Sequence, residues 1–241
     1  MEIFTYYLPL IIAYGVPILF AITFHEAAHG FVAHRLGDNT AYLLGRVSFN
    51  PIKHIDPIGT VLLPGMLIAF GSPFVFGYAK PVPVNFRALN NPRRDMVLVA
   101  AAGPGTNLFL AFLSALFIKF TLSLFGPEPF SAVPFVPSPA LALTLKSLEF
   151  SIFINVILAV FNMLPLPPLD GGRVAVGLLP KRPAMALAKL ERYGMLILIG
   201  LILVLPMLLQ NMGIKLNPFA LVILPIAFAL IKFIIGLVGL D

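Results

Sequence analysis

The sequence predicts an all-α membrane protein with about five to six transmembrane helices. Of its 241 residues, 59% are hydrophobic and 11% are charged, and the mean hydropathy is +0.99. A water-soluble domain of this size needs a more polar outer surface. Apolar runs of about 20 residues recur along the chain, and each can cross a hydrocarbon core of about 30 Å. The chain is therefore expected to be an integral, multi-pass protein surrounded by the lipid bilayer.

Five apolar runs are long enough to be predicted as transmembrane helices. In order along the chain they are Tyr6–Arg35, Met96–Leu124, Pro139–Met163, Met185–Leu209 and Pro218–Leu240. The first has no basic leader and no small-residue cleavage site, so it is expected to be a permanent span. We expect residues 1–241 to form a single domain, with a core at about 6–180 and additional C-terminal helices at about 185–240.

Two segments between the first two spans are expected to enter the membrane region without crossing it. Ile58–Phe70 is apolar but short for a full crossing, and we expect it to be re-entrant. Ser72–Val84 alternates apolar and small residues around Pro and Gly, which predicts an extended or β-hairpin-like segment near residues 72–84. Strand edges are unfavourable in lipid, so this segment should be covered by protein or lie at the interface.

The basic residues predict which side of the membrane each loop occupies. If the N-terminus is outside and Ile58–Phe70 returns to the side it entered from, twelve of the 16 Lys and Arg residues share one side. The positive-inside rule makes that side cytoplasmic. Membrane orientation thus accounts for the net charge of +6, and no nucleic-acid partner is expected. The absence of Cys excludes disulfides, thiolate nucleophiles and Cys-ligated metals.

The first predicted span carries three ionisable residues in the pattern HEAAH. His25 and His29 are four residues apart, so on a helix they lie one turn apart on the same face and can share one zinc ion. Glu26 is then placed to act as the general base on the attacking water. The alternative is a polar patch satisfied by interfacial water. Ionisable groups within a span cost about 2.5–3.5 kcal/mol each, which favours a metal site or an ion pathway.

A third ligand is needed, because catalytic zinc sites normally have three protein ligands. The best candidate is Asp170 in FNMLPLPPLDGGR, where prolines end the preceding helix and Gly171 and Gly172 give the backbone freedom to turn. The alternatives are an N-cap for a helix near Gly172–Leu179 or a partner for Arg173. The His pair lies near the inner end of the first span, and Asp170 follows the inner end of the Pro139–Met163 span. Both spans are expected to run from outside to inside, so the two sites should lie at the same depth.

These motifs together resemble the site-2 protease family of intramembrane metalloproteases, over most of the chain through about Leu179. The resemblance rests on HEAAH, AAAGPGTN at Ala100–Asn107, FNMLPLPPLDGGR at Phe161–Arg173 and FGYAKPVPVN at Phe76–Asn85. It implies that His25, His29 and Asp170 bind one zinc ion per chain and that Glu26 activates water. The sequence departs from larger members of the family in that no PDZ-like or CBS-like domain is expected, so we expect a compact member.

Two asparagines receive roles from the resemblance alone. Asn162 is expected to donate to the oxyanion or to a substrate carbonyl, and Asn107 to support packing or the substrate backbone. Alternatively, both are hydrogen-bond partners between helices.

The resemblance implies an intramembrane zinc endopeptidase that cleaves transmembrane segments of membrane-protein or peptide substrates in regulated intramembrane proteolysis. Its expected location is the cell membrane, with the active site near the cytoplasmic side, and the sequence leaves a homo-oligomer open. Two rivals remain: a membrane metal or proton transporter, and an inactive relative that acts as a scaffold.

Overall fold

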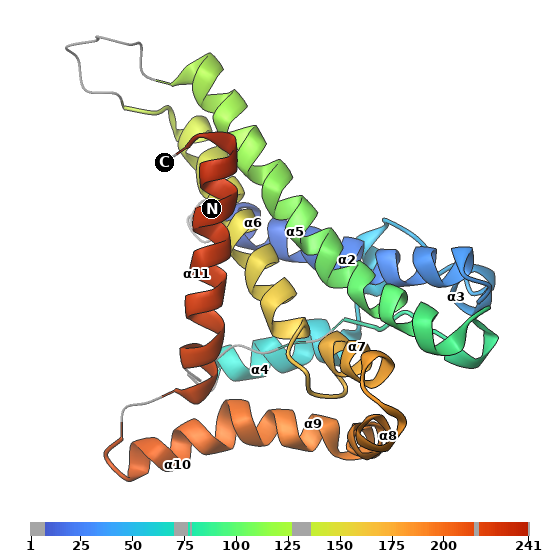
Figure 1. The fold of residues 1–241 in the computed structure, drawn as a ribbon. Helices are drawn as coiled ribbons and strands as arrows, with labels where there is room; N and C mark the ends of the chain where they lie inside the picture. The colour runs from blue at the N-terminus through green and yellow to red at the C-terminus, as the bar shows by residue number, and fades with distance from the viewer. Residues whose placement is uncertain (1–7, 70–76, 78, 127–135, 215–216, 241) are drawn as a thin grey trace.

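The computed structural model describes residues 8–69, 77, 79–126, 136–214 and 217–240, and throughout this part of the chain the regular structure is helical, with no strand (Figure 1). Among the described residues, five stretches are long and apolar enough to cross a membrane: Leu8–Arg35, Pro92–Phe125, Pro139–Asn162, Glu191–Asn211 and Ala220–Val238. They coincide with the five predicted spans, so the fold class predicted from the sequence is confirmed.

The first stretch contains η1 (Ile11–Gly15) and α2 (Val16–Arg35), and the next two are α5 (Pro92–Phe125) and α6 (Pro139–Asn162). The fourth is divided into α9 (Glu191–Ile199), η5 (Gly200–Val204) and α10 (Leu205–Asn211), and α11 is Pro218–Val238. The shorter helices are α3 (Thr40–Leu43), η2 (Pro51–His54), η3 (Pro57–Leu62), α4 (Leu63–Ala69), η4 (Phe86–Ala88), α7 (Asp170–Leu178) and α8 (Lys181–Lys189).

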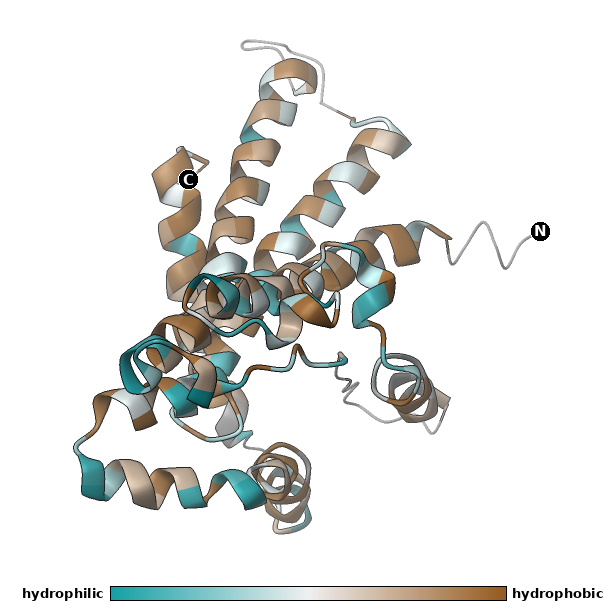
Figure 2. Cartoon of the chain, turned by 90° about the vertical axis from the view of Figure 1, so that its right-hand side faces the viewer, coloured by the Kyte–Doolittle hydropathy of each residue, from teal (hydrophilic) through white to brown (hydrophobic). Residues whose placement is uncertain are grey.

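The core is formed where α5 packs along α6 and both contact α2 and α11. Its central positions include small residues, Ala111 and Ala115 of α5 and Ala227 of α11, all fully buried. Small side chains allow helix backbones to approach closely, which is how helices associate in lipid. The outer faces of α5 and α11 instead expose Phe117 and Phe233, each about 60% accessible, as expected for surfaces that contact acyl chains. Figure 2 shows hydrophobic colour along the long helices and hydrophilic colour on short helices and turns.

One helix runs in a direction that the predicted topology does not give. Strict alternation of five crossings makes α11 antiparallel to α5, yet α11 runs beside α5 in the same direction (Figure 1). The ammonium group of Lys119, in the last third of α5, donates to the carbonyl of Val238 at the C-terminal end of α11 over 2.5 Å. The stretch Glu191–Asn211 lies across the end of the bundle instead of alongside α5. Hydropathy sets the length of an apolar helix but not its direction.

The two segments expected to avoid a full crossing are only partly described. Pro57–Leu62 and Leu63–Ala69 contain 6 and 7 residues, a rise of about 20 Å that is short of the hydrocarbon thickness. Re-entry therefore stays a prediction. Residues 72–76 and 78 of the predicted hairpin lie outside the described part, and residues 79–84 form neither helix nor strand. We call residues 79–84 the strap. It is held by Lys80, whose amide donates to the His54 carbonyl over 3.0 Å and whose carbonyl accepts from Arg46 over 2.7 Å.

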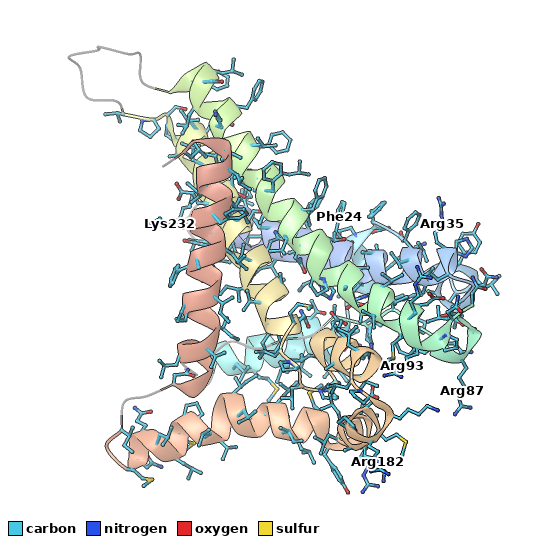
Figure 3. All side chains as sticks on the ribbon, viewed as in Figure 1. Phe24, Arg35, Arg87, Arg93, Arg182 and Lys232 are labelled. Atoms are coloured by element: carbon cyan, nitrogen blue, oxygen red, sulfur yellow. The ribbon has the colours of Figure 1, made fainter. Side chains whose placement is uncertain are left out.

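Basic side chains gather around one end of the bundle. Figure 3 shows Arg35, Arg87, Arg93 and Arg182 around the ends of α2, α5 and α8, and Lys232 on α11 apart from them. This grouping agrees with the charge asymmetry of the sequence.

Candidate metal centre

Helix α2 brings His25 and His29 together on its buried face. Both residues are less than 10% accessible, and their ring centroids are 4.6 Å apart in an edge-to-face arrangement. The two Nε2 atoms are separated by 3.0 Å. The spacing of four residues therefore produces the side-by-side placement that the sequence predicts.

Asp170 reaches the pair from the first turn of α7. The N-cap of this helix is Leu169, and no side chain caps it, so Asp170 is not the N-cap considered as an alternative. Nor does Asp170 pair with Arg173, whose guanidinium lies 3.5 Å from Glu191. The Oδ2 atom of Asp170 instead lies 3.2 Å from Nε2 of His25 and 3.3 Å from Nε2 of His29.

The two glycines after Asp170 serve a different purpose from the one predicted. Neither has a left-handed backbone, and both lie inside α7. A Cβ on Gly171 would lie 2.2 Å from the Met163 carbonyl oxygen, and one on Gly172 would lie 2.4 Å from the backbone nitrogen of Pro167. Glycine is needed because α7 packs directly on the backbone of the preceding turn, which fixes the position of Asp170.

The three atoms have the spacing of a tetrahedral metal site. Zinc bound at about 2.0–2.1 Å with tetrahedral angles places its ligand atoms about 3.3 Å apart. The observed separations are 3.0, 3.2 and 3.3 Å. Among the described residues, these three form the cluster of His and acidic side chains that could hold a metal ion, and all three are buried.

The hydrogen bonds behind the imidazoles leave their Nε2 atoms as acceptors. Nδ1 of His29 donates to the Val99 carbonyl over 2.7 Å. Asn107 donates through Nδ2 to the Ala21 carbonyl over 3.1 Å, so its Oδ1 faces His25 and accepts from Nδ1 over 2.6 Å. Each ring in its neutral form then presents a bare Nε2 toward the carboxylate, as in carboxylate–histidine metal sites.

Three acceptors meeting at 3.0–3.3 Å repel one another unless a cation lies between them. Oδ2 of Asp170 is buried and accepts no hydrogen bond from the described residues. A proton on one ring would bridge only part of the cluster, whereas one metal ion would satisfy all three atoms. The donor set of two imidazoles and one carboxylate fits zinc and leaves a fourth position open.

Helix α5 closes one side of the centre at Gly103. A Cβ on this residue would lie 2.5 Å from Nε2 of His29 and 2.6 Å from Nε2 of His25. Gly103 belongs to the AAAGPGTN motif, in which it had no predicted role. The signal that could have found it is the pair of glycines on either side of Pro104 within a long helix.

Glu26 lies beside the His pair at the edge of an apolar cavity of about 240 Å³. One carboxylate oxygen, Oε2, accepts a hydrogen bond from the Val82 amide of the strap over 2.7 Å. The cavity lies between α2, α6 and the helices α9 and η5. Its other lining residues include Ile22, Ala79, Leu158, Phe161, Asn162, Leu198 and Ile202.

The two predicted asparagines occupy different environments. Asn162, at the end of α6, lines the cavity with Glu26, and its Nδ2 donates to the Leu158 carbonyl over 3.0 Å. Asn107 is fully buried, with its oxygen on His25 and its nitrogen on Ala21 and Asn155. Asn155 was not singled out in the sequence analysis.

Comparison with known proteins gives the family. The family model described as "Peptidase family M50" matches residues 13–206, a range that contains every residue of the centre. The chain belongs to peptidase family M50. Its resemblance to site-2 proteases is thereby confirmed, and the multi-pass helical architecture is that of a membrane metalloprotease.

Curated relatives of this M50 chain carry matching descriptions. It is 39% identical over 204 residues to "Putative zinc metalloprotease YwhC" of Bacillus subtilis, covering 83% of the present chain and 85% of the relative. It is 30% identical over 185 residues to "Putative zinc metalloprotease Rip2" of Mycolicibacterium smegmatis and of Mycobacterium tuberculosis. In both comparisons with Rip2 the match covers 77% of this chain and 64% of the relative. No solved structure gives a significant match.

Proposed function

We propose that this M50 protease is a zinc endopeptidase that hydrolyses peptide bonds in or near the transmembrane segments of other membrane proteins. One observation supports it above all: three buried ligand atoms have tetrahedral spacing directly beside an apolar cavity that also contains a carboxylate. Family membership supports the protease chemistry, and the long apolar helices support a substrate that arrives from the membrane.

His25, His29 and Asp170 would hold one zinc ion per chain. When bound there, zinc would polarise the scissile carbonyl and lower the pKa of water toward about 7. The contribution of the protein is to fix the three ligands before the metal arrives. The Val99 carbonyl and the Asn107 amide lock the two rings, and the close packing at Gly171 locks the carboxylate.

Glu26 would accept the proton of the attacking water and later return it to the leaving amine. Its Oε2 accepts from the Val82 amide, which holds the carboxylate in one orientation, and we assign its other oxygen to the water. The strap is fixed in turn by the contacts of Lys80 with Arg46 and His54. General-base catalysis of this kind requires a base that is positioned and accessible, and Glu26 is only half-buried.

The cavity would admit an unwound stretch of substrate and exclude bulk water. Leu158, Phe161 and Leu198 give it an apolar wall suited to side chains of a transmembrane helix. A helical substrate shields its own amides, so it must unwind before a carbonyl can reach the site. The strap lies along the cavity through Ala79 and would pair with the unwound backbone by β-augmentation.

The roles of the asparagines follow from their surroundings. Asn162 has one amide hydrogen on its own helix and lies on the cavity wall, and we assign its second to the substrate carbonyl or the oxyanion. Asn107 has no access to the cavity, and we assign it to the orientation of His25.

The remaining expectations from the sequence are part of the same proposal. Residues 1–241 would act as one catalytic domain in the cell membrane, with the centre near the cytoplasmic side, where the basic residues gather. The substrates would be membrane proteins or peptides that share this bilayer.

The experiment compares metal content and cleavage of a transmembrane peptide for wild type, Glu26→Gln and Asp170→Ala in detergent. Glu26→Gln keeps an oxygen for the Val82 amide, so it should bind zinc normally while losing about 10²–10⁴-fold in kcat. Asp170→Ala removes one of three ligands and should purify with substoichiometric zinc. Wild-type kcat in Glu26→Gln, or one zinc ion per chain in Asp170→Ala, would refute the assignment.

A further inference from the structure

A chain of buried hydrogen bonds leads away from the metal centre into the contact between α5 and α6. It begins at Nδ1 of His25, which donates to Asn107. Nδ2 of Asn107 donates to Oδ1 of Asn155 over 2.8 Å, and Nδ2 of Asn155 donates to the Ser151 carbonyl over 2.9 Å. Asn107 and Asn155 are both at most 1% accessible.

The direction of every bond in this chain is fixed by backbone carbonyls, which can only accept. The Ser151 carbonyl, one turn earlier in the same helix, accepts a hydrogen from the Asn155 nitrogen. The Asn155 oxygen must therefore face Asn107. The Ala21 carbonyl and the Asn155 oxygen then both take hydrogens from the Asn107 nitrogen, which leaves the Asn107 oxygen for His25. Reversing the Asn107 amide would set its oxygen against two other oxygens.

We infer that Asn155 is a positioning residue for the metal centre, which acts on His25 through Asn107. This inference rests on the proposed zinc site. Asn155 touches neither the ligand atoms nor the cavity, yet it prevents the Asn107 amide from turning and thereby keeps the proton of His25 on Nδ1. Nε2 then stays bare and aimed at the metal position. Hydrogen bonds that all point the same way also reinforce one another in a buried setting.

The rival explanation is that Asn155 only joins two helices, as polar residues do in membrane bundles. The two explanations differ in which substitutions they expect to weaken zinc binding. A positioning role makes the effect on zinc depend on hydrogen-bond distance from His25. A joining role makes it depend on how much packing each substitution removes.

The test measures zinc dissociation constants of the full chain in detergent by competition with a chelator. Asn107→Leu should weaken zinc binding by about 100-fold and Asn155→Leu by about tenfold, the range found for partners of ligating histidines. Ser151→Ala should bind like wild type, because Asn155 keeps the Ser151 carbonyl. Asn155→Ser, which is too short to reach Asn107, provides a smaller change if the Leu variant does not fold, and it should also weaken binding about tenfold.

Val156→Ala is the matched control. Val156 is the next residue of α6, is fully buried and has only packing contacts, so this variant should lose thermal stability and keep wild-type zinc affinity. Nitrogen NMR of the ring nitrogens gives the second readout, since the chain has 4 His. Zinc-free wild type should show His25 protonated at Nδ1, and Asn155→Leu should show a mixture of tautomers.

The outcomes separate the two levels of the proposal. The positioning role would be overturned if both Asn155 variants kept wild-type zinc affinity, or if Val156→Ala lost as much zinc affinity as they do. Neither result would contradict the zinc site. No zinc binding by the wild type, or none lost in His25→Ala, would overturn the zinc site and the positioning role with it.

Discussion

Gly103→Ala should disable the metal centre while leaving its helix intact. The added Cβ would lie 2.5 Å from Nε2 of His29, whereas ordinary contacts begin at 3.4 Å. One of the two must therefore move by about 0.9 Å, but ligand distances at a metal site tolerate only about ±0.2 Å. The rings cannot retreat easily, because Val99 and Asn107 hold their far nitrogens.

The size of the effect follows from the cost of overpacking. An extra methyl in a tightly packed site costs about 1–3 kcal/mol, which would weaken zinc binding by about 5- to 150-fold. The zinc-free protein should be affected less, since alanine favours the helix over glycine by about 1 kcal/mol. The variant should thus fold, keep α5 and lose zinc.

The assay is chelator competition for zinc, followed by peptide cleavage at saturating zinc. Gly105→Ala is the matched control, because it lies two residues further along α5 and a Cβ there meets no atom of the described residues within 4 Å. It should behave like wild type. Equal zinc affinity of Gly103→Ala and Gly105→Ala would refute the reasoning from close packing.

Three further predictions concern the packing behind Asp170, the anchoring of the strap and the ionisation of Asp38. Gly171→Ala would set a Cβ 2.2 Å from the Met163 carbonyl oxygen and displace Asp170, so zinc affinity should fall at least about tenfold. Gly200→Ala, where a Cβ meets no described atom within 4 Å, should not change zinc affinity. Arg46→Gln should loosen the strap and reduce kcat by about tenfold or more at unchanged zinc content, measured by peptide cleavage; zinc loss would contradict this. Burial raises the pKa of the Asp38 carboxyl, but hydrogen bonds from Thr40 and the Asn85 amide outweigh it and hold the pKa below its usual range. The ionised Asp38 carboxylate therefore stabilises the fold above its unfolded pKa of about 3.9, and this contribution is lost as pH falls through the lower folded pKa. In Asp38→Asn the melting temperature should accordingly decline less steeply below about pH 4 than in wild type.

The sequence predicts the candidate metal ligands because their predicted placement depends on local geometry and span direction. Helical periodicity alone sets His25 beside His29, and no tertiary contact is needed to see it. Asp170 required one further step, namely that two spans run in the same direction and end at the same depth. The structure brings these three side chains together, with ligand atoms within 4.8 Å of one another.

The residues that the sequence analysis missed act through close approach between helices. Gly103 matters only because α5 passes the two rings, and Asn155 only because α6 meets α5 at Asn107. Neither approach follows from periodicity or hydropathy, since both depend on how the helices cross. For the same reason the direction of α11 differs from prediction: composition does not show that Glu191–Asn211 lies across the bundle.

The hydrogen-bond chain behind His25 does not provide the pathway that the rival function, a transporter, would need. A proton or metal pathway needs polar groups that continue from the centre toward the opposite face and can pass their cargo on. Here the chain passes through Asn155 to Ser151, whose hydroxyl meets Ser114 over 2.8 Å, and Ser114 donates to the carbonyl of Leu110 in its own helix. A backbone carbonyl has no proton to hand on, so the chain ends there. Each described member of the chain donates away from the centre, an arrangement suited to orienting the His25 imidazole.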